Sequence, residues 1–167
     1  MNRVAAVLGS ALFLVIAPGA VAVWLPWTFS RWRIQPPLLG FVPFRGLGVL
    51  LIALGLPVLL DSFRRFALQG LGTPAPIAPP QKLVVTGLYR HVRNPMYVAV
   101  VCLILGQALL FGSVQLLEYG LVVLLCFHLF VLLYEEPTLR GKFGAEYEEF
   151  CRNVRRWIPR VKPWSQV

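Results

Sequence analysis

The stretch PMYVAVVCLILGQALLFGSVQLLEYGLVVLLCFHLFVLLY, residues 95–134, decides the fold, because Glu118 is the only residue in it with a formal charge. One helix of this length would extend about 60 Å, whereas the hydrocarbon core of a bilayer is only about 30 Å thick. The stretch must therefore fold back on itself, and Gly112-Ser113 is the natural turn. We expect two membrane spans, near residues 95–111 and 116–134.

Two further apolar segments precede this hairpin. Residues 4–27 contain no charge and are longer than the ~7–15-residue core of a cleaved signal peptide, so we expect a retained first span. A second span is predicted over residues 41–60, where Arg45 lies one turn in and can extend to the membrane surface. This span also has small residues that allow close helix contact: Gly46, Gly48 and Gly55.

The composition and charge of the chain are typical of a polytopic membrane protein. Apolar residues make up 57% of the 167 residues and charged residues 14%, against about 45–50% and about 25% in soluble domains. We therefore expect an all-α fold, a single domain over residues 1–167 built as a membrane bundle of about four transmembrane helices. The three cysteines are scattered and predict neither a disulfide framework nor a metal site.

The basic residues, which give a formal charge of +9, flank the apolar segments. Of the 16 Lys and Arg residues, all except Arg31, Arg33 and Arg45 lie near the N-terminus, within residues 61–94 or within residues 135–167. The positive-inside rule then predicts that both termini are cytoplasmic, in the inner membrane if the source is bacterial. We expect membrane lipids as partners and no nucleic acid, because no polar nucleic-acid-binding module remains outside the spans.

An amphipathic helix is predicted after Glu135-Glu136-Pro137. Apolar side chains recur there at spacings of four, four and three residues, which suits a helix that lies on the membrane or caps the bundle. They are Leu139, Phe143, Tyr147 and Phe150.

Two segments carry the side chains suited to chemistry, Thr86–Tyr97 and Glu135-Glu136-Pro137. The predicted topology places both at the cytoplasmic ends of adjacent spans, where the hairpin brings them together. Asn94-Pro95 is typical of a helix N-cap followed by proline at the first helical position. The free N–H groups of such a helix start can hold a carboxylate, and Arg93 can add a charged hydrogen bond.

Aromatic and acidic side chains complete this candidate site. Tyr89 and Tyr97 offer ring faces on which a sulfonium or an adenine can rest. Glu135 offers a carboxylate to ribose hydroxyls or to an ammonium group. A ligand with a carboxylate, an ammonium, a sulfonium and a nucleoside fits these groups, as S-adenosylmethionine does, although an anionic lipid can use the same basic side chains.

Each part of the site has a plainer alternative. Arg90, His91 and Arg93 also suit cations that only set the topology, and Asn94-Pro95 also suits an ordinary helix start. The Glu135-Glu136 pair also suits solvated charges that end a span. His128 shares a helix face with Glu135, and such a histidine is more often a packing residue than a proton acceptor.

Three blocks of the sequence, taken together, resemble one family. They are Gly87-x-Tyr89-x-x-x-Arg93-Asn94-Pro95-x-Tyr97, then Glu135-Glu136-Pro137-x-Leu139-x-x-x-Phe143-Gly144-x-x-Tyr147, then Val154-x-Arg156-Trp157-x-Pro159. Their order and spacing resemble the isoprenylcysteine carboxyl methyltransferase and phospholipid methyltransferase superfamily of integral membrane enzymes. The resemblance covers about residues 80–160.

The resemblance implies that S-adenosylmethionine is the methyl donor and that the acceptor is lipophilic, a carboxylate, an amine or a thiol, entering from the bilayer. It places the cofactor among helix ends and cytoplasmic loops, at about residues 80–97 and 135–160. It implies backbone contacts from Gln81, Lys82, Leu83 and Val84, further contacts from Tyr89, Asn94, Pro95, Met96, Tyr97 and Glu135, and a bracing role for Arg93 and Glu136. The candidates for a catalytic role are Arg93, Glu135 and His128.

The sequence departs from the family pattern at two positions. Many members have histidine where this chain has Asn94, and the prenylcysteine enzymes have a basic residue at the position of Val131. A free prenylcysteine carboxylate is therefore not the acceptor we expect. Two other functions remain open at this point: an NADPH-dependent enzyme like the sterol reductases, which share a similar C-terminal helical motif, and a membrane protein without catalytic activity.

Overall fold

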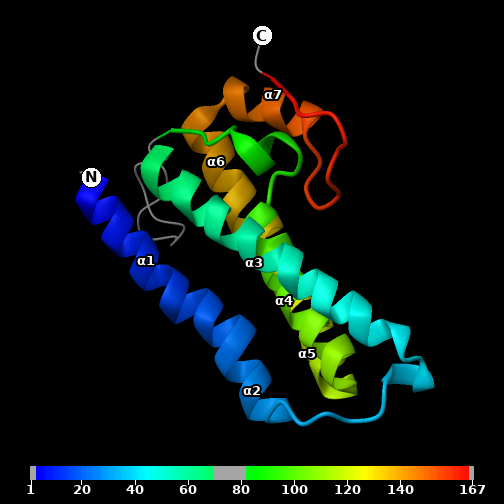
Figure 1. The fold of residues 1–167 in the computed structure, drawn as a ribbon. Coiled ribbons are helices and arrows are strands. Elements are labelled where there is room, and N and C mark those ends of the chain that lie inside the picture. The colour runs from blue at the N-terminus through cyan, green and yellow to red at the C-terminus, as the bar shows by residue number, and fades with distance from the viewer. Residues whose placement is uncertain (1–2, 70–81, 166–167) are drawn as a thin grey trace.

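The computed structural model describes residues 3–69 and 82–165, and every regular element in these ranges is a helix, so the predicted all-α class is confirmed (Figure 1). The long elements are α1 (Arg3–Gly19), α2 (Leu25–Ser30), α3 (Pro43–Gln69), α4 (Pro95–Phe111), α5 (Val114–Phe130), α6 (Glu136–Phe143) and α7 (Ala145–Asn153). Two π segments, η1 (Ala20–Trp24) and η4 (Val131–Glu135), join α1 to α2 and α5 to α6, and the 3-10 turns are η2 (Leu38–Gly40) and η3 (Gly87–Arg90).

The predicted hairpin is present, and α4 has the predicted bounds. Gly112 follows α4 with φ +71°, a left-handed conformation that favours glycine. Ser113 then caps α5, because its hydroxyl accepts a hydrogen bond from the Leu116 N–H at 3.3 Å. The predicted turn therefore has a glycine with a positive φ, which allows the chain to reverse sharply, and a serine that caps the next helix.

Two helices continue beyond the membrane spans that the sequence predicts. α3 continues to Gln69 instead of ending at residue 60, because the polar residues after the apolar stretch form helical ion pairs, Asp61 with Arg65 at 2.6 Å and with Arg64 at 3.0 Å. The last span was predicted to end at residue 134, but the helix runs unbroken from Val114 to Phe143.

A proline follows each of the two π segments. Pro26 lies at the start of α2, just after η1, and Pro137 lies at the start of α6, just after η4. A proline has no N–H, so one backbone hydrogen bond of the helix is missing at its position. A π turn just before the proline changes the hydrogen-bond register there. This explains why the helix continues through Pro137.

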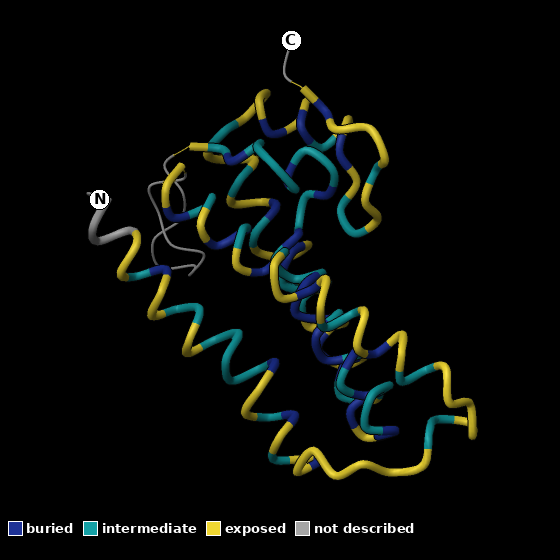
Figure 2. The backbone as a smooth tube through the Cα atoms, in the orientation of Figure 1, coloured by how far each residue is buried: buried dark blue, intermediate teal, exposed yellow. Residues whose placement is uncertain are grey.

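The core of the bundle is the contact between α3 and α4 (Figure 2). A Cβ atom on Gly48 would lie 2.6 Å from the Gly106 carbonyl oxygen and 2.7 Å from the Leu110 nitrogen. Gly55 lies close to Ala99 in the same way, whereas Gly46 faces open space. Two of the three glycines predicted for helix contact therefore make it, as small residues do in membrane helices.

The first helix is attached to the bundle through its π segment. Tyr119 donates a hydrogen bond to the Val21 carbonyl at 2.8 Å, and Gln107 donates one to the Ala22 carbonyl at 2.8 Å. A π segment leaves carbonyl groups outside the regular α-helical pattern, and these need a donor where no water is present. Side chains from α4 and α5 supply those donors.

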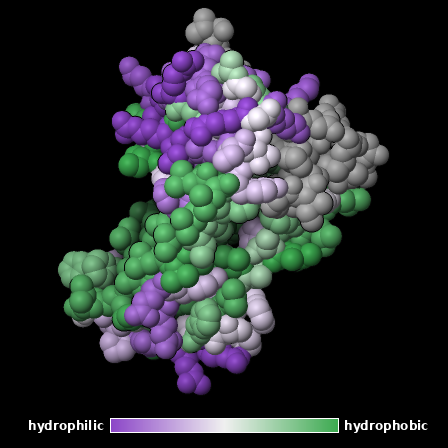
Figure 3. Space-filling model, turned by 180° about the vertical axis from the view of Figure 1, so that it is seen from behind, coloured by the Kyte–Doolittle hydropathy of each residue, from purple (hydrophilic) through white to green (hydrophobic). Residues whose placement is uncertain are grey.

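The molecule has an apolar part and a polar part (Figure 3). Among the described residues, three helices are long and apolar enough to cross a membrane, Val7–Ser30, Pro43–Gln69 and Val114–Phe143, and α4 is a shorter apolar helix. The protein is an integral membrane protein, and its four-helix arrangement is close to the predicted count. We call α1 to α5 with η1 and η4 the bundle, and residues 82–94 with 136–165 the cap.

Candidate active site where the bundle meets the cap

The two motif segments meet at a hydrogen bond between Tyr97 and Glu135. Tyr97 lies in the first turn of α4, and Glu135 is the last residue of η4. The Tyr97 hydroxyl donates to Glu135 Oε2 at 2.9 Å. The hairpin therefore brings together two residues that were predicted to lie on opposite walls of one site.

Aromatic rings surround this pair. The Tyr97 ring lies 4.7 Å from that of Phe127 and 6.5 Å from that of Trp157, between ring centroids. Tyr89, in η3, is buried, and its burial together with the charge of Glu135 raises its pKa well above the ordinary value. Tyr89 is therefore a neutral hydrogen-bonding group rather than a phenolate.

Gly87 begins the turn that carries Tyr89. It has φ +54°, and a Cβ atom at this position would collide with the Arg65 guanidinium. The backbone conformation therefore favours glycine, and a Cβ atom would also require the flexible Arg65 side chain to move. Arg65 also donates to the Thr86 hydroxyl at 3.5 Å, which connects the end of α3 to this turn.

Glu136 has a different environment from Glu135, although the two are adjacent. Its carboxylate is 3% exposed and accepts two hydrogen bonds from Arg156, at 2.6 and 3.0 Å. Arg93 Nη1 lies 3.3 Å from it and Arg140 Nη2 3.6 Å. The pKa of Arg156 is raised by this pairing, so the network is fully charged. Glu136 thus joins the start of α6 to the loop before α4 and to the C-terminal segment.

Arg93 takes part in this network with one end of its guanidinium. Nη1 faces Glu136 and Cys151, and the backbone N–H donates to the Arg155 carbonyl at 2.9 Å. Its Nε is buried and has no acceptor among the described residues. Arg93 is thus paired with Glu136, and its Nε remains for a further acceptor.

Asn94 occupies the N-cap position of α4, but its side chain does not cap the helix. It donates instead to the Arg156 carbonyl at 3.3 Å. The prediction of a capping side chain was therefore wrong, because the Nδ2 bond to the Arg156 carbonyl orients the amide toward the C-terminal segment. The N–H groups of Met96 and Tyr97 lie in the first helical turn, where the helix itself provides no acceptor.

The C-terminal segment is held against the loop before α4, a contact that the sequence analysis missed. The N–H groups of Arg160 and Trp164 donate to the His91 and Arg90 carbonyls at 2.9 and 3.0 Å. In return, Arg90 Nε donates to the Trp164 carbonyl, and His91 Nδ1 lies 2.8 Å from the Arg160 carbonyl. Arg90 and His91 are thus part of the cap architecture. Neither hydrophobic periodicity nor spacing signals this pairing, since it joins two irregular segments.

His128 is paired with the same C-terminal segment. The Trp157 indole N–H donates to His128 Nδ1 at 3.0 Å. An indole only donates, so Nδ1 must accept and carries no proton. In the neutral ring the proton is then on Nε2, which leaves no free nitrogen to act as a base. This geometry favours the packing role for His128.

The predicted amphipathic helix caps the bundle, but as two helices. Gly144, with φ +51°, separates α6 from α7. The apolar side chains on both sides enter one cluster, which comprises Tyr147, Phe150, Val154 and Trp164 with Leu83, Val85, Leu139, Phe143 and Cys151. Of the four residues expected to contact cofactor through the backbone, Leu83 and Val84 turn into the cap interior, Lys82 is exposed, and Gln81 lies outside the described residues.

An apolar cavity of about 440 Å³ lies on the bundle side of Tyr97. All four long membrane helices of the bundle contribute to its wall. Its lining residues are Phe13, Ala17, Pro18, Val21, Leu59, Phe63, Met96, Tyr97, Val100, Cys126, Phe127 and Phe130. Tyr97 therefore belongs both to the wall of this cavity and, through Glu135, to the polar site.

Fold and site together define the class as a polytopic membrane protein whose polar site adjoins an apolar cavity. The family model described as phospholipid methyltransferase matches residues 44–146, more than half of the chain. The chain belongs to the phospholipid methyltransferase family, and it is a membrane methyltransferase by that membership. We found no significant match among curated proteins or among solved structures. The matched range contains the first two sequence blocks, as far as Glu146, and ends before the Val154–Pro159 block.

Proposed function

We propose that this protein transfers a methyl group from S-adenosylmethionine to a lipophilic acceptor, and that it holds the cofactor in the manner of the isoprenylcysteine carboxyl methyltransferases. The observation that carries the proposal is the Tyr97–Glu135 hydrogen bond. It joins the two motif segments at the boundary between the polar cap and the apolar cavity. A polar methyl donor and a lipophilic methyl acceptor have to meet at such a boundary.

The residues present fit the polar groups of this cofactor. The candidate donors for the methionine carboxylate are the first-turn N–H groups of Met96 and Tyr97 and the buried Nε of Arg93. Glu135 accepts from Tyr97 with Oε2, and its other oxygen is suited to the ammonium or to the ribose. The rings of Tyr89 and Tyr97 are suited to the sulfonium.

The chain's own residues would act by positioning. S-adenosylmethionine, when bound, supplies an already activated methyl group. The nucleophile then has to be aligned with it and kept away from water. Tyr97 and the neighbouring rings of Phe127 and Trp157 form an apolar wall beside the place where the nucleophile and the methyl group would meet. The Glu136 network holds the two helix ends at a fixed separation.

We also propose that the cap lies in the cytoplasm. α1 begins at the cap end of the bundle, and α7 lies there as well (Figure 1). The basic residues of the cap therefore lie on the side that the positive-inside rule assigns to the cytoplasm. The cofactor would then reach its site from the cytosol and the acceptor from the bilayer.

Calorimetric titration of the purified protein with S-adenosylhomocysteine tests the proposal. We expect binding by the wild type and at least about tenfold weaker binding by Glu135→Ala, since one charged hydrogen bond contributes about 1.5–3 kcal/mol. Glu118→Ala is the matched control, because Glu118 is exposed at the far end of the same helix. Unchanged affinity in Glu135→Ala, or binding of NADPH instead, would contradict the proposal.

A second experiment tests the reaction itself. Labelled S-adenosylmethionine is incubated with the protein and a membrane extract, and the organic phase is analysed for label. The proposal predicts label in a lipophilic product with the wild type and not with Glu135→Ala.

A further inference from the structure

We propose that the C-terminal loop of the cap, residues 155–163, docks into the membrane leaflet on the cap side. Ile158 and Val161 lie among the lipid chains, and anionic headgroups bind at Arg155 and Lys162. The docked loop holds an aromatic side chain against the candidate site. The docking itself needs no assumption about the reaction, whereas its effect on the site rests on the proposed function.

The C-terminal loop is held at both ends. Val154, just before it, and Trp164, just after it, are buried in the apolar cluster of the cap. Between these two anchors the chain turns from α7 toward the bundle and then returns to the cap (Figure 1). Even so, Ile158 is 63% exposed and Val161 is 95% exposed. Apolar side chains presented in this way by an anchored loop indicate a surface for lipid or for a partner.

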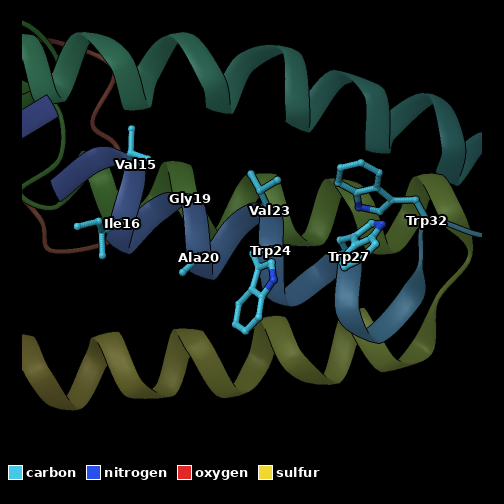
Figure 4. A pocket seen from close by; sticks show the side chains of 8 residues that line it. All are labelled: Val15, Ile16, Gly19, Ala20, Val23, Trp24, Trp27 and Trp32. Atoms are coloured by element: carbon cyan, nitrogen blue, oxygen red, sulfur yellow. The ribbon is translucent and has the colours of Figure 1, made fainter. Parts of the chain in front are cut away.

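The far end of the bundle shows where one membrane boundary lies. Trp24, Trp27 and Trp32 gather at the end of the first membrane helix, on the side away from the cap (Figure 4), and tryptophan is enriched at membrane boundaries. The Trp32 ring stacks on that of Phe111, the last residue of α4, with 6.5 Å between the ring centroids. This boundary is therefore level with the turn between α4 and α5.

The C-terminal loop lies at the other boundary. Along α5 and η4, the helical rise from Val114 to Glu135 is about 30 Å, which is about the thickness of the hydrocarbon core. His128 lies about 10 Å before Glu135 on this path. The Trp157 indole donates to His128 at 3.0 Å, so this side chain lies alongside the membrane helix, and Ile158 is the next residue. The loop therefore reaches the level at which the lipid chains begin.

The charge of the loop suits anionic headgroups. Residues 154–165 contain four basic residues and no Asp or Glu. One of the four, Arg156, is paired with Glu136, whereas Arg155 and Lys162 are exposed. Exposed cations beside a membrane surface attract anionic lipids, and the depth of the loop favours lipid over a protein partner from the aqueous phase.

Docking affects the candidate site through Trp157. Its ring lies 6.5 Å from that of Tyr97, between ring centroids, and its indole N–H is bonded to His128. A loop docked in the leaflet keeps this ring beside Tyr97, whereas a loop that leaves the membrane carries the ring away with it. Anionic lipid therefore strengthens cofactor binding at the site, by the modest amount that one positioning contact contributes.

Photo-crosslinking tests the docking. Val161→p-benzoylphenylalanine is made in the full-length protein, which is placed in nanodiscs of phosphatidylcholine and phosphatidylglycerol in equal amounts. After irradiation, mass spectrometry identifies the adducts. We expect lipid adducts in which phosphatidylglycerol exceeds phosphatidylcholine at least about threefold, as cations near the surface dictate. The same replacement at Glu149, exposed on α7 away from the bundle (Figure 1), is the control and should give no lipid adducts. Absence of lipid adducts at Val161, or crosslinks to a second copy of the chain instead, overturns the proposal.

Charge variants of the crosslinking protein test the headgroup contact. Arg155→Gln combined with Lys162→Gln should abolish the preference for phosphatidylglycerol while lipid adducts remain. Lys142→Gln combined with Arg152→Gln removes the same charge from other exposed positions of the cap and should retain the preference. The same preference in both proteins would show that Arg155 and Lys162 do not bind the headgroups.

Calorimetric titration with S-adenosylhomocysteine tests the effect on the site. We expect the wild type to bind a few fold more tightly in nanodiscs that contain phosphatidylglycerol than in phosphatidylcholine alone. Arg155→Gln with Lys162→Gln should lose this difference, and Lys142→Gln with Arg152→Gln should keep it. Equal affinity of the wild type in both lipids overturns the link to the site. No binding in either lipid would instead reject the proposed function, and the crosslinking would still decide the docking.

Discussion

The bundle and the cap are stabilised in different ways. In the bundle, α3 and α4 approach so closely that Gly48 and Gly106 leave no room for a Cβ atom. The cap instead depends on the charges around Glu136 and on the pairing of the C-terminal segment with Arg90 and His91. Close packing of apolar surfaces stabilises the bundle, and specific polar contacts stabilise the cap. The candidate site lies where the two regions meet. Glu135 belongs to the candidate site, whereas Glu136 holds parts of the cap together.

The largest effect is expected in the bundle. Gly48→Leu places a side chain against the backbone of Gly106 and Leu110, and overpacking of this kind costs about 3 kcal/mol or more. We expect a strongly lowered melting temperature in detergent. Gly46→Leu is the control, since a Cβ atom there meets nothing within 4 Å. Equal stability of the two variants would show that the close approach of α3 and α4 is not what holds the bundle.

An intermediate effect is expected in the cap. Glu136→Gln removes the charge that compensates Arg93, whose side chain is 10% exposed, and breaking a buried pair costs about 2–4 kcal/mol once the partial exposure of Arg156 is considered. We expect lower stability and weaker binding of S-adenosylhomocysteine. Glu148→Gln, which removes an exposed partner of Arg140, should change neither. A Glu136→Gln variant with normal stability would contradict the architectural role.

The smallest effect is expected at the contact between the two regions. Trp157→Phe keeps an aromatic ring but removes the indole N–H, and the loss of its hydrogen bond to His128 costs about 1 kcal/mol. His128→Leu combined with Trp157→Phe should cost little more, and methyl transfer should change by only a few fold. A general base contributes about 10²- to 10⁴-fold, so a loss of that size in His128→Leu would restore His128 as the proton acceptor.

The sequence predicted the bundle better than the cap, for a physical reason. Hydrophobicity and helix length are local properties, so they located α4 and the Gly112-Ser113 turn correctly. They gave no sign that α3 and the last long helix continue beyond their apolar stretches, where ion pairs and a π segment extend the helix. Only packing in three dimensions determines such extensions.

The candidate site was predicted in part. The meeting of Tyr97 with Glu135 follows from a hairpin between two motif segments, whereas the ion pair between Arg93 and Glu136 was not predicted. The side-chain partners of Asn94 and His128 were not predictable, because both are provided by the C-terminal segment. That segment has no periodic pattern, and its position depends on contacts between residues about 60 to 75 positions apart in a folded chain.

The most direct test of the central claim is an experimental structure of the protein with S-adenosylhomocysteine. We predict that the ligand lies beside the Tyr97–Glu135 hydrogen bond, with its carboxylate at the Met96 and Tyr97 N–H groups and its sulfur facing the apolar cavity. A ligand bound away from Glu135, or a structure in which Tyr97 and Glu135 are far apart, would contradict the account.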